Sequence, residues 1–259
     1  MSPALRSATD CPAWRELETL AQTLGASSTR ELFARDAQRF EHCCVEAAGL
    51  ALDYSRQRVD ARVINCFAAL ADQLSLRSRI EAMFRGDPIN STENRAVLHT
   101  ALRRSNEAAL EVAGEDIGAL VRAQREHMLS FAEDVRSGII RSSSDQSFTL
   151  VVNIGIGGSD LGPAMAVQAL KQFSSGAPNV AFASNVDGCQ LADLLEHADP
   201  ARTLFIICSK TFTTLETLTN ARTARAWILQ RLGPKGLPQH FAAVSVNAKA
   251  MDEFGVHPD

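Results

Sequence analysis

The sequence has no apolar run of membrane-spanning length, no block of basic residues and no pair of cysteines at CxxC spacing. The missing apolar run excludes a transmembrane helix. The excess of 30 Asp and Glu over 26 Lys and Arg argues against a general binder of nucleic acid or anionic membranes. We expect no secretory signal, because residues 1–11 include an aspartate and lack an apolar core. The six scattered cysteines then indicate reduced thiols in a cytoplasmic protein.

A metal-ligand pattern is also missing. His99, His127 and His240 stand apart from one another and from the cysteines, which favours structural histidines over zinc ligands. We therefore expect no bound metal.

What is present suits one or two globular domains, with 46% hydrophobic and 22% charged residues in a chain of 259. Residues 1–120 are expected to form a helical segment. Apolar residues recur there at helical spacing over four stretches, 14–24, 33–44, 62–84 and 92–104. Ser28 and Glu31 have the spacing of a capping box, and 50–54 is expected to be a short extended segment.

Residues 121–259 have a different pattern, in which continuous apolar runs alternate with helical stretches. The runs are 148–154, 179–183, 203–208 and 240–246. Strands that are apolar without alternation belong to a parallel sheet covered on both faces. We predict an α/β fold for this part, a doubly wound parallel sheet in three layers, preceded by the helical segment.

The first predicted strand leads into a glycine-rich loop, Gly155 to Pro163. Glycines allow a tight turn and close approach of a ligand, and Ser159 or Asp160 can cap the helix that Pro163 helps to begin. A dinucleotide fingerprint would need glycine in place of Asp160, and a Walker loop would need lysine in place of Pro163. Both nucleotide patterns therefore fit poorly.

The third predicted strand leads into the loop Ser209 to Thr214, which precedes a helix over 215–231. Its hydroxyls and the Lys210 ammonium meet the exposed amides of a helix start, a natural site for a phosphate dianion. Lys210 is expected to act through its field, and Phe212 to pack. Glu216 has two open interpretations, an ordinary acid in the first turn of the helix or a functional residue.

The two loops are expected to lie next to each other if the strands are ordered 2-1-3-4. They would then flank the switch point, where ligands bind beyond the carboxyl ends of a parallel sheet. Each loop alone has an ordinary explanation, a turn or a helix cap. The two together favour a ligand site.

Several longer strings match one family. They are NIGIGGSDLGP from Asn153, SNVDG from Ser184, SKTFTTLET from Ser209, AVSVN from Ala243, EFGVHPD from Glu253, LFARDAQRF from Leu32, LDYSRQR from Leu52 and INSTENRAVLHTALR from Ile89. On these strings the chain resembles the phosphoglucose isomerase family from about residue 32 onward.

The resemblance implies a sugar-isomerase type of fold and interconversion of glucose 6-phosphate and fructose 6-phosphate through a cis-enediol, without a cofactor. The residues that it assigns to substrate and phosphate binding are Gly158, Ser159, Ser209, Lys210, Thr211 and Thr214. Glu216 matches an acid that helps to position the ring-opening histidine. The implied partners are a sugar phosphate and a second subunit of a homodimer, with no nucleic acid or membrane.

Members of this family are about twice as long, and the resemblance places the glutamate base, the ring-opening histidine and a late lysine beyond Asp259. We therefore assign no catalytic residue and expect a phosphate-binding half with little turnover alone. The alternative is a regulatory domain that binds a phosphosugar without converting it. The long match in the first half and the lack of a basic DNA-reading segment argue against that alternative.

Overall fold

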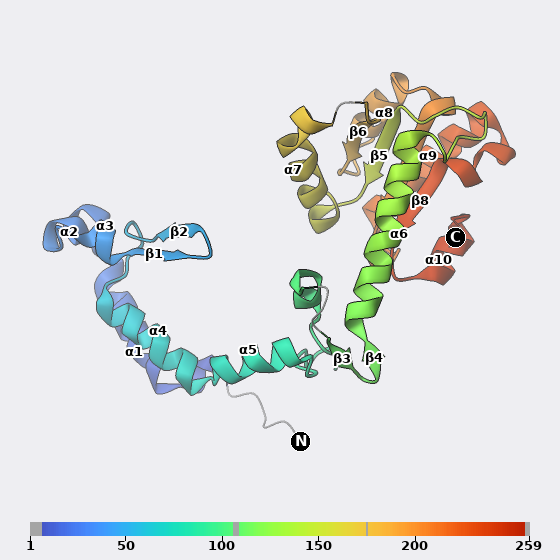
Figure 1. Ribbon diagram of the computed structural model, residues 1–259. Helices are drawn as coiled ribbons and strands as arrows, with labels where there is room; N and C mark the ends of the chain where they lie inside the picture. The colour runs from blue at the N-terminus through green and yellow to red at the C-terminus, as the bar shows by residue number, and fades with distance from the viewer. Residues whose placement is uncertain (1–6, 106–108, 175, 257–259) are drawn as a thin grey trace. The chain divides into compact units, whose positions relative to one another are not determined.

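The computed structural model describes residues 7–105, 109–174 and 176–256 (Figure 1). The chain divides into two compact units, Met1–Arg122 and Ala123–Asp259. Helix α6 (Ile117–Ser137) crosses the boundary between them. Among the described residues, no helix combines the length and apolar character needed to cross a membrane.

The first unit consists mainly of short helices. Its elements are η1 (Ala8–Asp10), α1 (Pro12–Gly25), α2 (Thr29–Arg35), α3 (Arg39–His42), β1 (Cys44–Ala47), β2 (Leu50–Asp53), α4 (Ala61–Gln73), α5 (Leu76–Arg85), η2 (His99–Arg103), β3 (Glu111–Val112) and β4 (Glu115–Asp116). The predicted capping box at Ser28 and Glu31 is confirmed at the start of α2. The extended segment predicted over 50–54 is confirmed as β2, which pairs antiparallel with β1.

Three of the predicted helices are wrong in part. The helix expected over 33–44 ends at Arg35 because Asp36 is extended, and the chain then makes one turn, α3, before β1. The helix over 62–84 is interrupted by Ser75, whose φ of 52° lies in the left-handed region. The stretch 92–104 keeps only the short helix η2, because the Asn90 side chain accepts hydrogen bonds from Thr92 and Glu93 and favours a turn.

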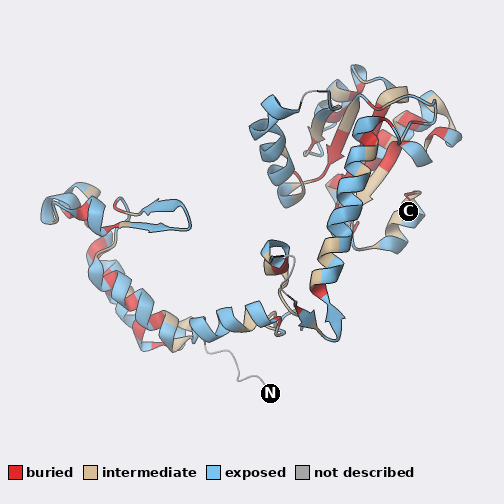
Figure 2. Ribbon diagram, in the orientation of Figure 1, coloured by how far each residue is buried: buried red, intermediate tan, exposed pale blue. Residues whose placement is uncertain are grey.

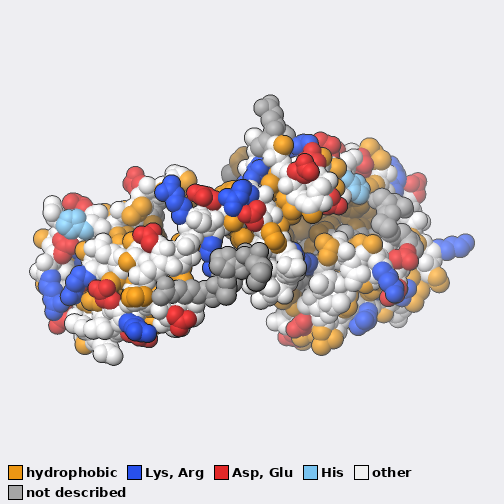
Figure 3. Space-filling view, turned by 90° about the horizontal axis from the view of Figure 1, so that it is seen from below, with side chains coloured by type: hydrophobic (Ala, Val, Ile, Leu, Met, Phe, Trp, Pro, Cys, Tyr) orange, Lys and Arg blue, Asp and Glu red, His pale blue; other side chains and the backbone are white. Residues whose placement is uncertain are grey.

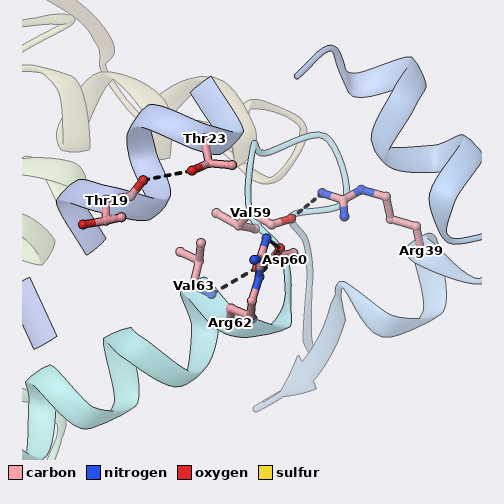
Figure 4. Close-up of polar contacts among 7 residues, drawn as sticks. All are labelled: Thr19, Thr23, Arg39, Val59, Asp60, Arg62 and Val63. Atoms are coloured by element: carbon pink, nitrogen blue, oxygen red, sulfur yellow. Dashed lines mark hydrogen bonds and ion pairs between the residues drawn. The ribbon is translucent and has the colours of Figure 1, made fainter. Parts of the chain in front are cut away.

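Buried Arg39 organises the loop between β2 and α4 (Figure 4). Its guanidinium donates to the carbonyls of Ser55, Gln57 and Val59 over 2.7, 2.8 and 2.8 Å. Asp60 ends the loop and caps α4 through the backbone N–H groups of Arg62 and Val63. The three hydrogen bonds from its guanidinium compensate for the burial of the Arg39 charge.

The second unit contains the predicted parallel sheet. Its further elements are β5 (Leu150–Ile154), η3 (Gly157–Ser159), α7 (Leu161–Ala169), η4 (Lys171–Phe173), β6 (Asn179–Ala183), α8 (Gly188–Glu196), η5 (Pro200–Arg202), β7 (Thr203–Cys208), α9 (Leu215–Leu232), η6 (Pro234–Gly236), η7 (Pro238–His240), β8 (Phe241–Val244) and α10 (Ala248–Phe254). The four strands are parallel in the order β6-β5-β7-β8, which confirms the predicted 2-1-3-4 arrangement.

Helices cover both faces of this sheet, so the three-layer prediction is confirmed. On one face, Phe131 and Val135 of α6 pack with Leu204 of β7. On the other face, Ala224 and Ile228 of α9 join the core that includes Phe205 of the same strand. Successive residues of a strand point to opposite faces, which accounts for this division. Burial is greatest in β5 and β7, and the strands of the sheet show red and tan segments between mainly blue helices in Figure 2.

Helix α7 buries little of its apolar surface. Leu161 and Met165 are 69% and 68% exposed, and Phe173 of η4 is 72% exposed. In Figure 2 this helix is pale blue over most of its length. Hydrophobic side chains are also visible on the face of the molecule drawn in Figure 3. The surface of the described chain is therefore partly apolar.

Candidate functional site

The two loops singled out in the sequence leave the sheet at the same edge. Strand β5 ends at Ile154 and β7 ends at Cys208, and the two strands are paired in parallel with Ile154 opposite Ile207. Strand β6 lies on the other side of β5, so the chain reverses its winding direction between β5 and β7. Residues 155–160 and 209–214 therefore flank the switch point, where doubly wound domains bind ligands.

The glycine-rich loop turns tightly around Ser159. A Cβ on Gly155 would lie 2.7 Å from the Ser159 carbonyl oxygen, so only glycine fits there. Gly157 has a φ of 59°, and Gly158 is exposed with open space where a side chain would begin. Asp160 occupies the N-cap position of α7 without the capping hydrogen bond expected of it or of Ser159. The turn therefore presents backbone at an open surface.

The hydroxyl-rich loop brings side chains together at the start of α9. Ser209 Oγ, which is buried, lies 3.2 Å from Thr214 Oγ1. Thr211 Oγ1 lies 2.6 Å from Thr213 Oγ1. Thr214 is the N-cap residue of α9, yet its side chain makes no capping hydrogen bond. The explanation of this loop as an ordinary helix cap therefore does not account for its hydroxyls.

Phe212 anchors the middle of this loop. Its side chain is 3% exposed, and its ring lies 5.7 Å from that of Phe254 in an edge-to-face contact. The predicted packing role of Phe212 is confirmed. Its φ of 55° is unusual for a bulky residue and is held by this burial and by the bond from its N–H to the Ser209 carbonyl.

The segment after β8 holds the carbonyl groups of the same loop. The Lys210 carbonyl accepts from Val246 N at 3.0 Å and from Ser245 Oγ at 3.1 Å, and Asn247 Nδ2 donates to the Thr211 carbonyl at 2.9 Å. Carbonyl oxygens repel an anion. Because the Lys210 and Thr211 carbonyls are hydrogen-bonded to the segment after β8, binding of an anion beside the loop's N–H groups and hydroxyls is favoured. The Lys210 side chain itself is exposed.

The remaining candidates have simpler surroundings. Glu216 is half-buried in the first turn of α9, where its charge complements the helix dipole. His240 is fully buried; its Nδ1 donates to the Thr203 carbonyl at 2.7 Å and its Nε2 accepts from Ser143 Oγ at 3.1 Å. The structural role predicted for His240 is confirmed. Over the described ranges, no three His, Cys, Asp or Glu side chains gather as metal ligands.

Sequence reasoning missed two residues beneath the loops, Asn153 in β5 and Cys208 at the end of β7. Asn153 Nδ2 donates to the Ser159 carbonyl at 3.0 Å, and Cys208 Sγ donates to Asn153 Oδ1 at 3.0 Å. Burial raises the pKa of the Cys208 thiol to about 11, so it keeps the proton that it donates. Asn153 could have been identified in the sequence because it is a polar residue inside an otherwise apolar run.

Two cavities in the chain lie away from these loops. One, of about 490 Å³, lies in the first unit beside Arg39, His42 and Arg62. Several of its polar side chains have protein partners, because His42 Nδ1 lies 3.0 Å from Asp36 Oδ2 and Arg62 pairs with Asp60 at 2.7 Å. The other, of about 650 Å³, lies between α8 and α9.

The fold and the loops together define a class. The second unit is a doubly wound α/β domain with a hydroxyl-rich helix start beside a glycine turn at its switch point. Switch points and helix starts are where domains of this class bind anionic ligands. Comparison with known proteins narrows the class. A family model described as phosphoglucose isomerase matches residues 53–259. The chain therefore belongs to the phosphoglucose isomerase family, as its resemblance predicted.

Relatives at high identity support this membership. The chain is 47% identical over 247 residues to the glucose-6-phosphate isomerase of Methylocella silvestris, covering 95% of this chain and 45% of that protein. It is 49% identical over 246 residues to the enzyme of the same name from Roseiflexus sp. (strain RS-1), covering 95% and 45%. The chain thus spans somewhat less than half the length of these relatives.

A solved structure is similar as well. The crystal structure of a glucose-6-phosphate isomerase from Chlamydia trachomatis matches with a TM-score of 0.74 and 27% identity, over 97% of this chain and 47% of that chain. The matched string EFGVHPD ends in residues 257–259, which lie outside the described residues.

Proposed function

We propose that this chain is the phosphate-binding half of a glucose-6-phosphate isomerase, an enzyme that interconverts glucose 6-phosphate and fructose 6-phosphate. The observation that carries the proposal is the start of α9, where the Ser209 and Thr214 hydroxyls lie 3.2 Å apart and Thr214 makes no capping bond. The names of the relatives supply the substrate.

The loop holds the phosphate dianion through several weak groups that act together. The first N–H groups of a helix have no partner within the helix and carry partial positive charge, so they attract an anion. The hydroxyls of Ser209, Thr211 and Thr214 donate to phosphate oxygens, and the exposed Lys210 ammonium adds a positive field. Engagement of the loop carbonyls by the segment after β8 keeps this arrangement fixed.

The glycine turn receives the carbon chain of the sugar. Gly158 and Ser159 lie on the adjacent strand's loop, and the open space at Gly158 allows the substrate to approach the backbone. Binding energy from a remote phosphate is then used to orient the carbons between which the proton moves. The base and the ring-opening acid are assigned to the half that the relatives have in addition, and Glu216 to a supporting role. The full-length enzyme is proposed to be a homodimer and to be located in the cytoplasm.

Calorimetry and a coupled assay test the proposed function. We expect the chain to bind glucose 6-phosphate and fructose 6-phosphate, and to bind neither glucose nor NAD measurably. In a coupled isomerase assay we expect little or no turnover by the chain alone. Tight binding of NAD without binding of a sugar phosphate would refute the proposal. Robust turnover would show that the catalytic groups are present in this chain.

A further inference from the structure

Asn153 is a buried amide in the middle of an apolar strand. Its side chain is 7% exposed, and its neighbours Val152 and Ile154 are fully buried. A polar group in such a place is costly unless it is hydrogen-bonded. Both ends of this amide are used. Nδ2 donates to the carbonyl of Ser159 in the glycine turn, and Oδ1 accepts from the thiol of Cys208.

The two partners of Asn153 belong to the two different loops of the candidate site. Ser159 is in the turn that follows β5, and Cys208 is the residue directly before Ser209. The amide therefore links the base of the glycine turn to the base of the hydroxyl-rich loop. It crosses from β5 to β7, strands that are adjacent in the sheet.

The two loops nevertheless have separate supports. The carbonyls of the hydroxyl-rich loop are held by Ser245, Val246 and Asn247, which follow β8. The Ser159 carbonyl is held by Asn153 from within the sheet and lies against Gly155, where a Cβ would be 2.7 Å from it. The opposite side of this turn, at Gly157 and Gly158, is open.

We propose that Asn153 is a positioning residue that fixes the Gly157–Ser159 turn for the polyol part of a sugar phosphate, while the phosphate part depends on the loop 209–214. The inference rests on the proposed function and assigns the two parts of the ligand to different loops. The Ser159 N–H donates to the Ile156 carbonyl and the Gly157 carbonyl accepts from Asp160 N. By holding the Ser159 carbonyl inward as well, the amide directs the exposed backbone at Gly158 toward sugar hydroxyls. Cys208 contributes by orienting the amide, because a thiol that donates to Oδ1 leaves Nδ2 directed at Ser159.

If the sugar and the phosphate are held by different loops, loss of Asn153 should affect the binding of glucose 6-phosphate and of inorganic phosphate differently. We would measure dissociation constants for glucose 6-phosphate and for inorganic phosphate by calorimetry on the full chain. Asn153→Leu should weaken glucose 6-phosphate binding about tenfold, the effect of one lost hydrogen bond, and change phosphate binding by less than about twofold. Cys208→Ala should have a smaller effect in the same direction, and Cys208→Ser, which keeps a donor, should restore binding.

A matched control separates positioning from general destabilisation. Asn220 is 3% exposed in α9, and its Nδ2 donates to the Asn185 carbonyl at 2.7 Å, so Asn220→Leu removes a comparable buried bond outside both loops. We expect it to leave the ratio of the two dissociation constants unchanged. Circular dichroism would verify folding, and the Cys208 pair provides the test if Asn153→Leu does not fold.

The outcomes distinguish the two proposals. Equal weakening of both ligands by Asn153→Leu, or no weakening of either, would overturn the positioning role and leave the proposed function standing. So would a Cys208→Ser variant that binds no better than Cys208→Ala. If the unsubstituted chain bound neither ligand, the proposed function would fail and the positioning role with it.

Discussion

Ser209 Oγ lies 3.2 Å from Thr214 Oγ1, which joins the two ends of the hydroxyl-rich loop at the start of α9. Ser209 is 3% exposed, whereas Thr214 is half-buried. Two neighbouring hydroxyls beside helix N–H groups that have no partner within the helix form an arrangement that suits an oxygen-rich anion.

The first prediction concerns these two hydroxyls. Ser209→Ala or Thr214→Val should each weaken glucose 6-phosphate binding by about 1.5–3 kcal/mol, because a hydrogen bond to a charged group is lost. Inorganic phosphate should lose a similar amount. Calorimetry measures both affinities.

The matched control for Thr214→Val is Thr223→Val. Thr223 is an exposed residue further along α9 whose hydroxyl donates to the Thr219 carbonyl at 3.1 Å. Its removal should leave both affinities unchanged. Unaltered binding in the Ser209 and Thr214 variants would show that the loop is only a helix start.

The sheet could be predicted from the sequence because its signal is local. Each of the four strands is a largely apolar run, and the placement of both loops at one edge follows from parallel pairing. The helix breaks at Asp36 and Ser75 could not be predicted in this way, since the backbone there departs from helical geometry within polar stretches that read equally well as helix.

The hydrogen bond between Asn153 and Cys208 beneath the site also could not be predicted from sequence patterns. Asn153 and Cys208 are 55 residues apart and meet only because β5 and β7 are neighbours. The polar residue in the run over 148–154 could have been noticed, but its partner depends on the strand order. Local periodicity contains no information about which side chains face each other across a sheet.

The second prediction concerns the close approach at Gly155. Gly155→Ala places a methyl group 2.7 Å from the Ser159 carbonyl oxygen and 2.9 Å from its Cβ, both closer than van der Waals contact allows. We expect a loss of about 1–3 kcal/mol in the free energy of unfolding, as for other overpacked sites, together with weaker binding of glucose 6-phosphate. Urea denaturation and calorimetry measure the two effects.

Gly162→Ala is the control for this substitution. Gly162 lies in α7 with open space around its would-be Cβ, so alanine there should stabilise the chain by about 0.5–1 kcal/mol. If Gly155→Ala were as stable as the unsubstituted chain, the Ser159 turn would have to be freer to move than its packing indicates.

The third prediction concerns pH and His240. Burial lowers the pKa of His240 below its ordinary value of 6.5, an effect only partly offset by its bond to the Thr203 carbonyl. Above that ordinary value both folded and unfolded chains are neutral at this residue. Below it, the unfolded chain binds a proton that the folded chain does not. The free energy of unfolding should therefore fall as the pH is lowered from 6.5 toward the folded pKa, by at most about 1.4 kcal/mol per pH unit.

His240→Asn isolates this contribution, because the asparagine amide can donate to the Thr203 carbonyl but does not titrate near neutral pH. Urea denaturation between pH 5 and 8 should give a shallower pH dependence for the variant than for the unsubstituted chain. Identical slopes would mean that His240 is protonated equally readily in both states.

The fourth prediction concerns the reactivity of Cys208. Its pKa, raised by burial from 9.0 to about 11, lowers the thiolate fraction about a hundredfold near pH 8, and the thiolate is the form that iodoacetamide modifies. Cys189 is exposed; its pKa is also raised, chiefly by the charge of Asp187, but the reagent reaches it freely. Timed alkylation followed by peptide mass spectrometry should show Cys189 modified and Cys208 intact. In concentrated urea the two should react at similar rates. Equal rates in the folded chain would mean that the end of β7 opens readily, and that the thiol does not hold Asn153 against the glycine turn.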